Sequence, residues 1–77
     1  METPLSTGVY QHYKGGYYQL IGVAEHTETN EKMVVYVSLA VLPGSRLRVR
    51  PLKMFQELLA WPDGGHRPRF DYVGYEI

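Results

Sequence analysis

The chain has no cysteine, no excess of charge of either sign and no long apolar run. Without cysteine, neither a disulfide nor a thiolate–metal site can stabilise the fold, so a reducing, cytoplasmic setting is expected. Eight basic residues balance eight acidic ones, so a nucleic acid would have to bind a local patch. The apolar stretches within residues 33–42 are far shorter than the roughly 20 residues that cross a bilayer. The segment 1–6 lacks the basic and apolar parts of a signal peptide, so neither export nor membrane insertion is expected.

The length of 77 residues indicates a single domain. We expect a disordered tail over residues 1–7 and one domain over residues 8–77. A chain this short buries about 60–65% of the surface that its unfolded form exposes, which leaves little room for a deep, dry active-site cavity. Aromatic residues are plentiful, with seven tyrosines, two phenylalanines and one tryptophan. Tyrosine suits half-buried strand positions, so this excess favours β-sheet.

Turn-forming residues divide the chain into short extended segments. Gly15-Gly16 predicts a two-residue hairpin turn, and Asn30 suits a left-handed position in the polar loop that follows the second strand. Pro51 opens a stretch that predicts one or two helical turns up to about Gln56, because the first helical turn does not need the missing N–H of proline. The segment 57–61 fits a strand or a helix. The expected extended segments are 9–14, 17–27, 32–40, 46–50 and 67–77, and further turns are expected at 28–31, 43–45 and 62–65.

Two hairpin registers predict which side chains share a face of the sheet. With Gly15-Gly16 as the turn, Gln11 faces Leu20, and with a loop over 28–31, Ala24 faces Val35. Both registers place the same side chains on one core face. This agreement supports the registers, because a slip by one residue would move every side chain of a strand to the other face. That face comprises Val9, Tyr13, Tyr18, Leu20, Ala24, Val35, Val37 and Leu39. The opposite face carries an apolar patch of Tyr10, Ile21, Val23, Val34 and Tyr36, which a C-terminal segment with Phe70, Tyr72 and Tyr75, a second copy or a ligand would have to cover.

Several motifs resemble the DUF1653 family of small bacterial proteins. The similar segments fall in order along the chain over about residues 8–72, and they are Gly8–Tyr18, Gly22–Glu28, Val34–Tyr36, Val49–Phe55 and Pro68–Phe70. The resemblance implies a small SH3-like β-barrel of uncharacterised function. The loop Leu42-Pro43-Gly44-Ser45 departs from the family pattern in lacking an aromatic residue. We therefore expect an all-β fold, a bent-sheet barrel of about five strands with one short helical turn.

The sequence offers little support for an enzyme or for a metal site. The three histidines, His12, His26 and His66, have no metal-ligand spacing, and zinc normally takes three or four protein ligands. His26 is expected at a rim of the fold, hydrogen-bonded near Glu28. No nucleophile with a base and an orienting group is recognisable, so no catalytic residue, metal or cofactor is predicted.

Basic and aromatic residues instead suggest a noncatalytic binding module. Arg46, Arg48 and Arg50 alternate along one strand, and Arg50 and Arg69 each precede a residue that fixes the backbone. The predicted ligand would be an acidic or phosphate-bearing group, or a peptide. An RNA- or single-stranded-DNA-binding barrel that uses the same arginines is the alternative, and a homodimerising structural module is the third. The predicted groove consists of Tyr10, His12, Tyr36, Arg50 and Arg69.

Overall fold

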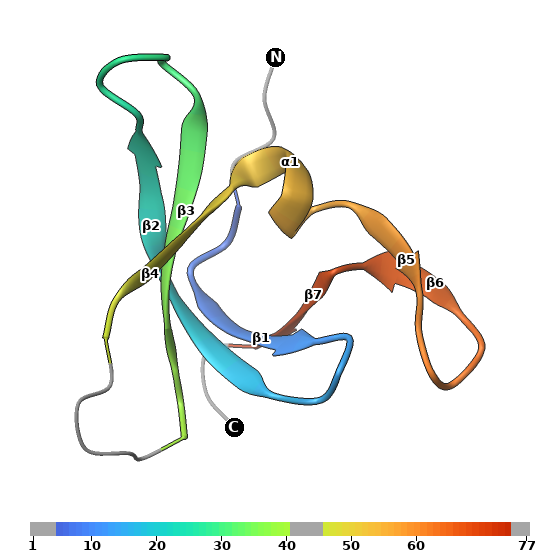
Figure 1. Ribbon diagram of the computed structural model, residues 1–77. Helices are drawn as coiled ribbons and strands as arrows, with labels where there is room; N and C mark the ends of the chain where they lie inside the picture. Colours follow the sequence, from blue (N-terminus) through green and yellow to red (C-terminus); the bar gives the residue numbers. More distant parts are fainter. Residues whose placement is uncertain (1–4, 41–45, 75–77) are drawn as a thin grey trace.

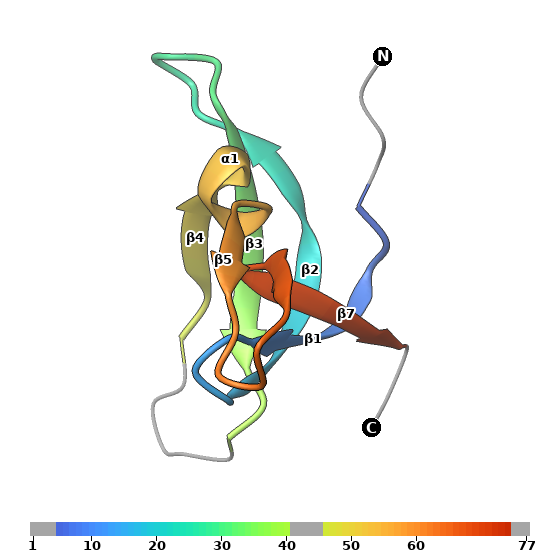
Figure 2. The ribbon, with the colours of Figure 1, turned by 90° about the vertical axis from the view of Figure 1, so that its right-hand side faces the viewer.

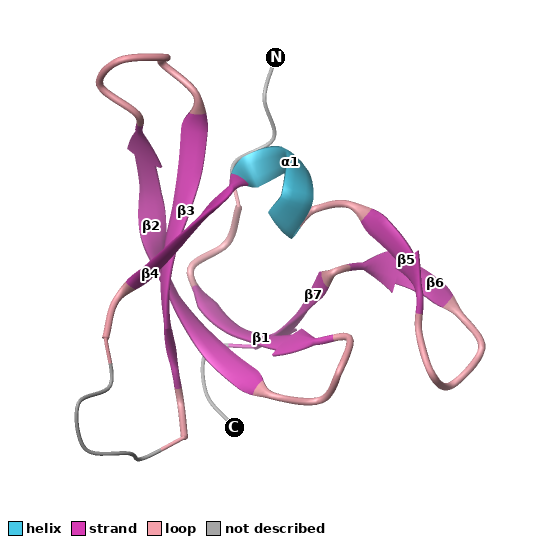
Figure 3. Cartoon of the chain, viewed as in Figure 1, coloured by secondary structure: helices cyan, strands magenta, loops and turns pink. Residues whose placement is uncertain are grey.

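The computed structural model describes residues 5–40 and 46–74 of the chain. Almost all of its regular structure is extended, and the one helix in this part has four residues (Figure 3). No helix in the described ranges is long and apolar enough to cross a membrane. The elements in chain order are β1 (Gly8–His12), β2 (Tyr17–Glu25), β3 (Lys32–Ser38), β4 (Arg48–Pro51), α1 (Leu52–Phe55), β5 (Leu58–Ala60), β6 (His66–Pro68) and β7 (Phe70–Gly74).

Five of the strands form one antiparallel sheet in the order β4-β3-β2-β1-β7. β5 and β6 form a separate hairpin, which extends away from the main sheet as an arm (Figures 1 and 2). The long β2 strand bends, so that its first half pairs with β1 and the sheet curves around α1 (Figure 1). The predicted all-β class with a bent sheet and one short helical turn is confirmed. Within the described residues β4 and β7 are the two edges and do not pair with each other.

The β1–β2 turn differs from the predicted one, and this reverses the faces of β1. The Gly15 N–H donates to the His12 carbonyl at 2.7 Å, and the His12 N–H donates to the Gly16 carbonyl at 2.7 Å. Gly15 has a φ of 117°, which glycine adopts readily, so the loop closes over three residues rather than two. Gln11 therefore faces Tyr17, not Leu20. The shift is by an odd number of residues, and it brings Tyr10 onto the face of Leu20.

The β2–β3 hairpin contains a bulge that the predicted register lacked. Asn30 has the expected left-handed conformation, with a φ of 61°. The pairing runs from Glu25 opposite Lys32 to Gly22 opposite Val35, and then shifts at Ile21, so that Leu20 faces Tyr36. A bulged residue inserts one extra position into one strand, so the faces of the two strands change their relation beyond it. The predicted partners of β2 were wrong even before the bulge, because pairing begins at Glu25 rather than at Thr27, so that Ala24 faces Met33 and not Val35. Beyond the bulge the relation of the faces also changes, and the predicted core side chains of β3 point the other way.

The core lies on the concave face of the sheet. Phe55 from α1 and Phe70 from β7 stack against each other, with ring centroids 4.3 Å apart and planes within 2°. The C-terminal segment thus covers most of the apolar patch that the sequence placed on a second face. Ile21 and Val23 remain about half exposed. The buried core cluster comprises Tyr10, Leu20, Val34, Tyr36, Phe55 and Phe70, with Leu5, Tyr18 and Leu52 packed against it.

The segment from Pro51 to Trp61 resolves the ambiguity between helix and strand. Pro51 has an extended ψ of 137°, and helix α1 begins after it at Leu52. The chain then enters β5 at Leu58, so part of the segment 57–61 is a strand. The predicted turn at 43–45 and the expected packing of Tyr75 lie outside the described residues. The SH3-like character of the fold stays a prediction.

Candidate functional site

Three of the five predicted site residues, His12, Tyr36 and Arg50, lie around the ring of Phe70, and a fourth, Arg69, lies over the neighbouring ring of Tyr13. We call this group the basic–aromatic cluster. His12 pairs with Phe70 across β1 and β7, and Arg50 reaches the same ring from β4. The cluster consists of His12, Tyr36, Arg50 and Arg69 together with the rings of Tyr13, Tyr18 and Phe70.

His12 is the most constrained titratable group of the cluster. Its imidazole packs edge-on against Phe70, with ring centroids 4.7 Å apart, and it lies 4.8 Å from the ring of Tyr13. Burial lowers the pKa of His12, and the positive charges of Arg50, Arg69 and Lys14 lower it further. The Lys14 backbone N–H donates to Nδ1 at 3.1 Å, so the neutral ring carries its proton on Nε2. His12 is thus a neutral hydrogen-bond donor amid positive charge.

Arg50 is held by aromatic groups rather than by acids. Its guanidinium carbon lies 5.6 Å from the centroid of the Phe70 ring, and its Nε–H donates to the Tyr36 hydroxyl at 3.4 Å. Among the described residues no carboxylate forms an ion pair with it. Because only Nε is used in this way, the two terminal nitrogens remain to bind a carboxylate or phosphate in a bidentate manner.

Arg69 belongs to the cluster but is also tied into the fold. Its Nε–H donates to the Met54 carbonyl at 3.1 Å, and a terminal nitrogen pairs with Glu57 at 2.7 Å. Its guanidinium carbon lies 5.8 Å from the Tyr13 ring, and its side chain is only 17% exposed. Arg69 therefore contributes charge to the cluster while it fastens β7 to the end of α1.

Tyr10 is the predicted site residue that the structure does not bring into the cluster. Its ring packs against Phe55 and Tyr72 in the core, and its hydroxyl donates to the Ser6 carbonyl at 2.6 Å. Burial, with a smaller contribution from Tyr72, raises the pKa of this hydroxyl. Tyr10 also lines a separate cavity of about 270 Å³ beside Leu5. Its contacts are those of a core residue.

Sequence reasoning missed three aromatic members of the cluster, of which Phe70 was expected only to cover the apolar patch. Tyr13 and Tyr18 were assigned to the core, but both side chains are only half-buried. Tyr18 packs edge-on against Tyr36 and Phe70, with centroids 5.5 Å apart in each pair. The signal that could have found Tyr13 is its place beside the glycine turn, since a three-residue loop would put it at the tip of the hairpin.

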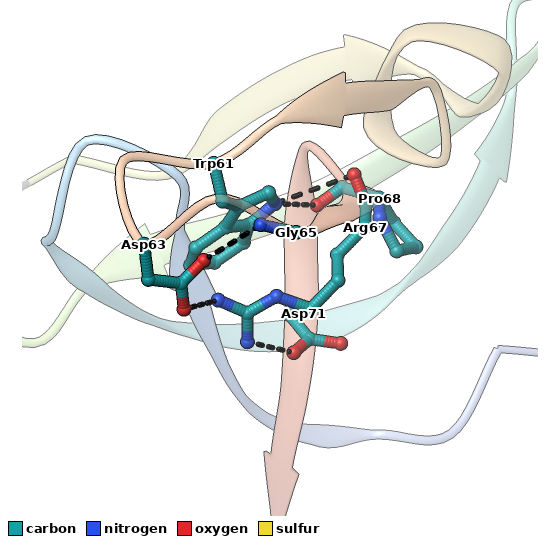
Figure 4. A network of polar contacts seen from close by, with 6 residues as sticks. All are labelled: Trp61, Asp63, Gly65, Arg67, Pro68 and Asp71. Carbon is teal, nitrogen blue, oxygen red and sulfur yellow. Dashed lines mark hydrogen bonds and ion pairs between the residues drawn. The ribbon is translucent and has the colours of Figure 1, made fainter.

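A second arginine, Arg67, lies in a contrasting environment on strand β6 of the β5–β6 arm (Figure 4). Its guanidinium carbon lies 3.9 Å from the centroid of the buried Trp61 ring, and it pairs with Asp63 and with Asp71. The Trp61 indole N–H donates to the Pro68 carbonyl at 3.0 Å. We call these residues the Arg67 network. Both carboxylates contact the arginine, so the positive charge of Arg67 is compensated within the network, and the second carboxylate leaves the network with a net negative formal charge.

A groove of about 250 Å³ separates the β1–β2 turn from the β5–β6 arm. Tyr13 and Lys14 line one wall, and Trp61 and Pro62 line the other. Tyr13 also belongs to the basic–aromatic cluster, so the groove and the cluster adjoin at this ring.

Of the other two histidines, His26 forms a hydrogen bond within its own loop. His26 lies in the β2–β3 loop, where its Nδ1 accepts the Glu28 backbone N–H at 3.2 Å, as the sequence predicted. In the described part of the chain no three His, Asp or Glu residues are grouped so that they could hold a metal ion.

Comparisons with known proteins identify the family. The sequence pattern described as "protein of unknown function (DUF1653)" matches residues 8–72. A crystal structure of a DUF1653 protein from Bordetella bronchiseptica is 39% identical and superposes with a TM-score of 0.80, covering 92% of this chain and 90% of that one. No curated protein matches the sequence. The chain therefore belongs to the DUF1653 family, as its motifs indicated, and the family's function is unknown.

Proposed function

We propose that this protein is a noncatalytic binding module that takes an anionic group between Arg50 and His12. The observation that carries the proposal is the environment of Arg50. Arg50 is half-buried, and its guanidinium lies against Phe70 and Tyr36 instead of a carboxylate from the described residues. A cation in a partly desolvated site attracts an anion more strongly than one in open water, because the surrounding dielectric screens the charge less.

The neighbouring groups support the same chemistry. The neutral imidazole of His12 offers its Nε2–H as a second donor, and Lys14 and Arg69 add positive charge. Of these cations, Arg69 has an acidic partner in Glu57. The formal charge of the whole chain is zero, so the positive charge gathered here is a local feature. The half-buried rings of Tyr13 and Tyr18 would contact the apolar part of a ligand.

The proposal is tested by titrating the isotope-labelled protein with sodium acetate and with sodium phosphate at constant ionic strength. We expect the amide resonances of His12 and Arg50 to shift with a millimolar dissociation constant. Arg50→Ala should weaken this binding at least about tenfold, or about 1.4 kcal/mol. Lys53→Ala removes one exposed positive charge from α1 and is the matched control, which should bind as the parent protein does. Equal binding by parent and Arg50→Ala would refute the proposal.

Self-association is a second candidate function, favoured by exposed apolar side chains. Leu47 is 65% exposed, Val49 60% and Ile21 52%. Val49 points away from Arg50, because side chains alternate along a strand, so this apolar surface is separate from the cluster. Sedimentation at high protein concentration tests this candidate: a dimer that Val49→Lys dissociates would support it, and a monomer would exclude it.

A further inference from the structure

We infer that the ligand is an extended peptide segment that places an acidic side chain in the basic–aromatic cluster and its neighbouring residues in the adjoining groove. This inference rests on the proposed function and specifies its ligand. The cluster alone could take any small anion. The groove beside it is what distinguishes a chain molecule from an isolated anion.

The groove is suited to a polypeptide by the chemistry of its walls. Tyr13, Trp61 and Pro62 line the groove and offer apolar surface for side chains. Gln11 lines the same groove with an amide that both donates and accepts, which suits a peptide main chain. Tyr13 joins the two parts: it contacts His12 on one side and lines the groove on the other.

Charge complementarity favours an acidic peptide over a polyanion. Lys14 lines the groove, and both Lys14 and Arg50 lie near His12 in the adjoining cluster. Neither cation forms an ion pair with a carboxylate of the described residues, so one ligand carboxylate would sit beside them. The opposite wall carries the carboxylate of Asp63, which already holds Arg67 and the Gly65 N–H. A nucleic acid would bring another phosphate with every nucleotide, and the Arg67 network, which has two carboxylates for one arginine, would oppose it. A peptide with a single acidic residue brings no such second charge.

The test compares four probes by chemical-shift titration of the whole chain: sodium acetate, a capped hexapeptide of alanine and leucine with one central glutamate, the same peptide with glutamine, and a six-nucleotide deoxythymidine oligomer. We expect the glutamate peptide to bind at least tenfold more tightly than acetate. It should shift amides on both walls of the groove, including those of Gly15 and Asp63. The glutamine peptide should bind at least tenfold more weakly than the glutamate peptide.

A groove variant, with Gln11→Ala and Pro62→Ala together, separates the two parts of the site. It should lower the ratio of peptide affinity to acetate affinity at least fivefold. A ratio unchanged in a folded variant would overturn the peptide inference. Shift mapping of the parent protein gives an independent answer if the variant does not fold.

The remaining outcomes distinguish failure of the peptide inference from failure of the proposed anion site. If acetate binds and the glutamate peptide binds no better, with shifts confined to the cluster, the peptide inference is wrong and the anion site stands. If the oligonucleotide binds more tightly than the glutamate peptide, the ligand is a nucleic acid and the inference is again wrong. If acetate, phosphate and peptide all leave the spectrum unchanged, the proposed function itself fails.

Discussion

Arg50 and Arg67 are two arginines in one small fold, and they differ in what surrounds them. Arg67 lies on Trp61 between two carboxylates, whereas Arg50 lies on Phe70 beside a tyrosine hydroxyl and a neutral histidine. A paired arginine on an aromatic ring stabilises the contact between the segments it joins. An arginine that keeps its terminal nitrogens away from protein carboxylates contributes less to folding and leaves more for a ligand. Replacing Arg67 should therefore mainly lower the stability of the fold, whereas replacing Arg50 should mainly weaken ligand binding.

The largest effect on stability is expected from the removal of Arg67. Arg67→Ala should lower the free energy of unfolding by about 2 kcal/mol, because it removes a contact with Trp61 and leaves Asp63 and Asp71 unpaired. Urea denaturation at neutral pH, followed by the fluorescence of Trp61, measures this loss. Arg48→Ala on exposed β4 is the control and should change stability little. A loss below about 0.5 kcal/mol for Arg67→Ala would show that the network is not structural.

Arg69 should give an intermediate result, since it contacts both the fold and the cluster. Arg69→Ala removes the hydrogen bond to Met54 and the pair with Glu57, so a loss of about 1 kcal/mol is expected. Acetate binding should weaken as well, by less than for Arg50→Ala. Thermal unfolding and the acetate titration of the same variant provide both measurements. Weakened acetate binding with unchanged stability would show that Arg69, like Arg50, serves the ligand and not the fold.

The free energy of unfolding should depend on pH through His12. Because the folded pKa of His12 is lowered, the unfolded chain binds its proton more readily. Stability is then fully present above the unfolded pKa of about 6.5 and declines as the pH falls through it. His12→Gln should reduce this decline between pH 7.5 and 5.5 in urea denaturation. An anion in the cluster should raise the pKa of His12, which a proton titration with and without phosphate would detect.

Arg50 should show the smallest effect on folding. Arg50→Ala should change the free energy of unfolding by less than about 0.5 kcal/mol, because the residue loses one long hydrogen bond and a partly exposed ring contact. Urea denaturation beside Arg67→Ala checks the contrast directly. A large loss would make Arg50 structural and remove the main argument for an anion site at this position.

Site residues that were chosen from short sequence motifs were placed better than residues that were assigned to a face from a hairpin register. Arg50 and Arg69 were chosen from short motifs, and both lie in the cluster. Tyr10 and Tyr36 were grouped as one surface patch, but the two rings are buried and only the hydroxyl of Tyr36 reaches Arg50. The faces were assigned from hairpin registers, and one extra loop residue beside Gly15 or one bulge at Ile21 reverses them.

The β-rich class, the approximate ends of the first three strands, the left-handed Asn30 and the helical turn after Pro51 follow from the sequence alone. These features depend on residues close together in the chain, whose preferences act locally. The expected single segment 67–77 is instead divided at Arg69 into β6 and the strand β7. Only the tertiary structure decided which face became the core, because that choice depends on Phe55 and Phe70 packing against strands far away in sequence. It also decided that Arg67 meets two carboxylates while Arg50 meets aromatic groups. An arginine's role is set by the groups that folding brings to it, and the sequence around it does not contain them.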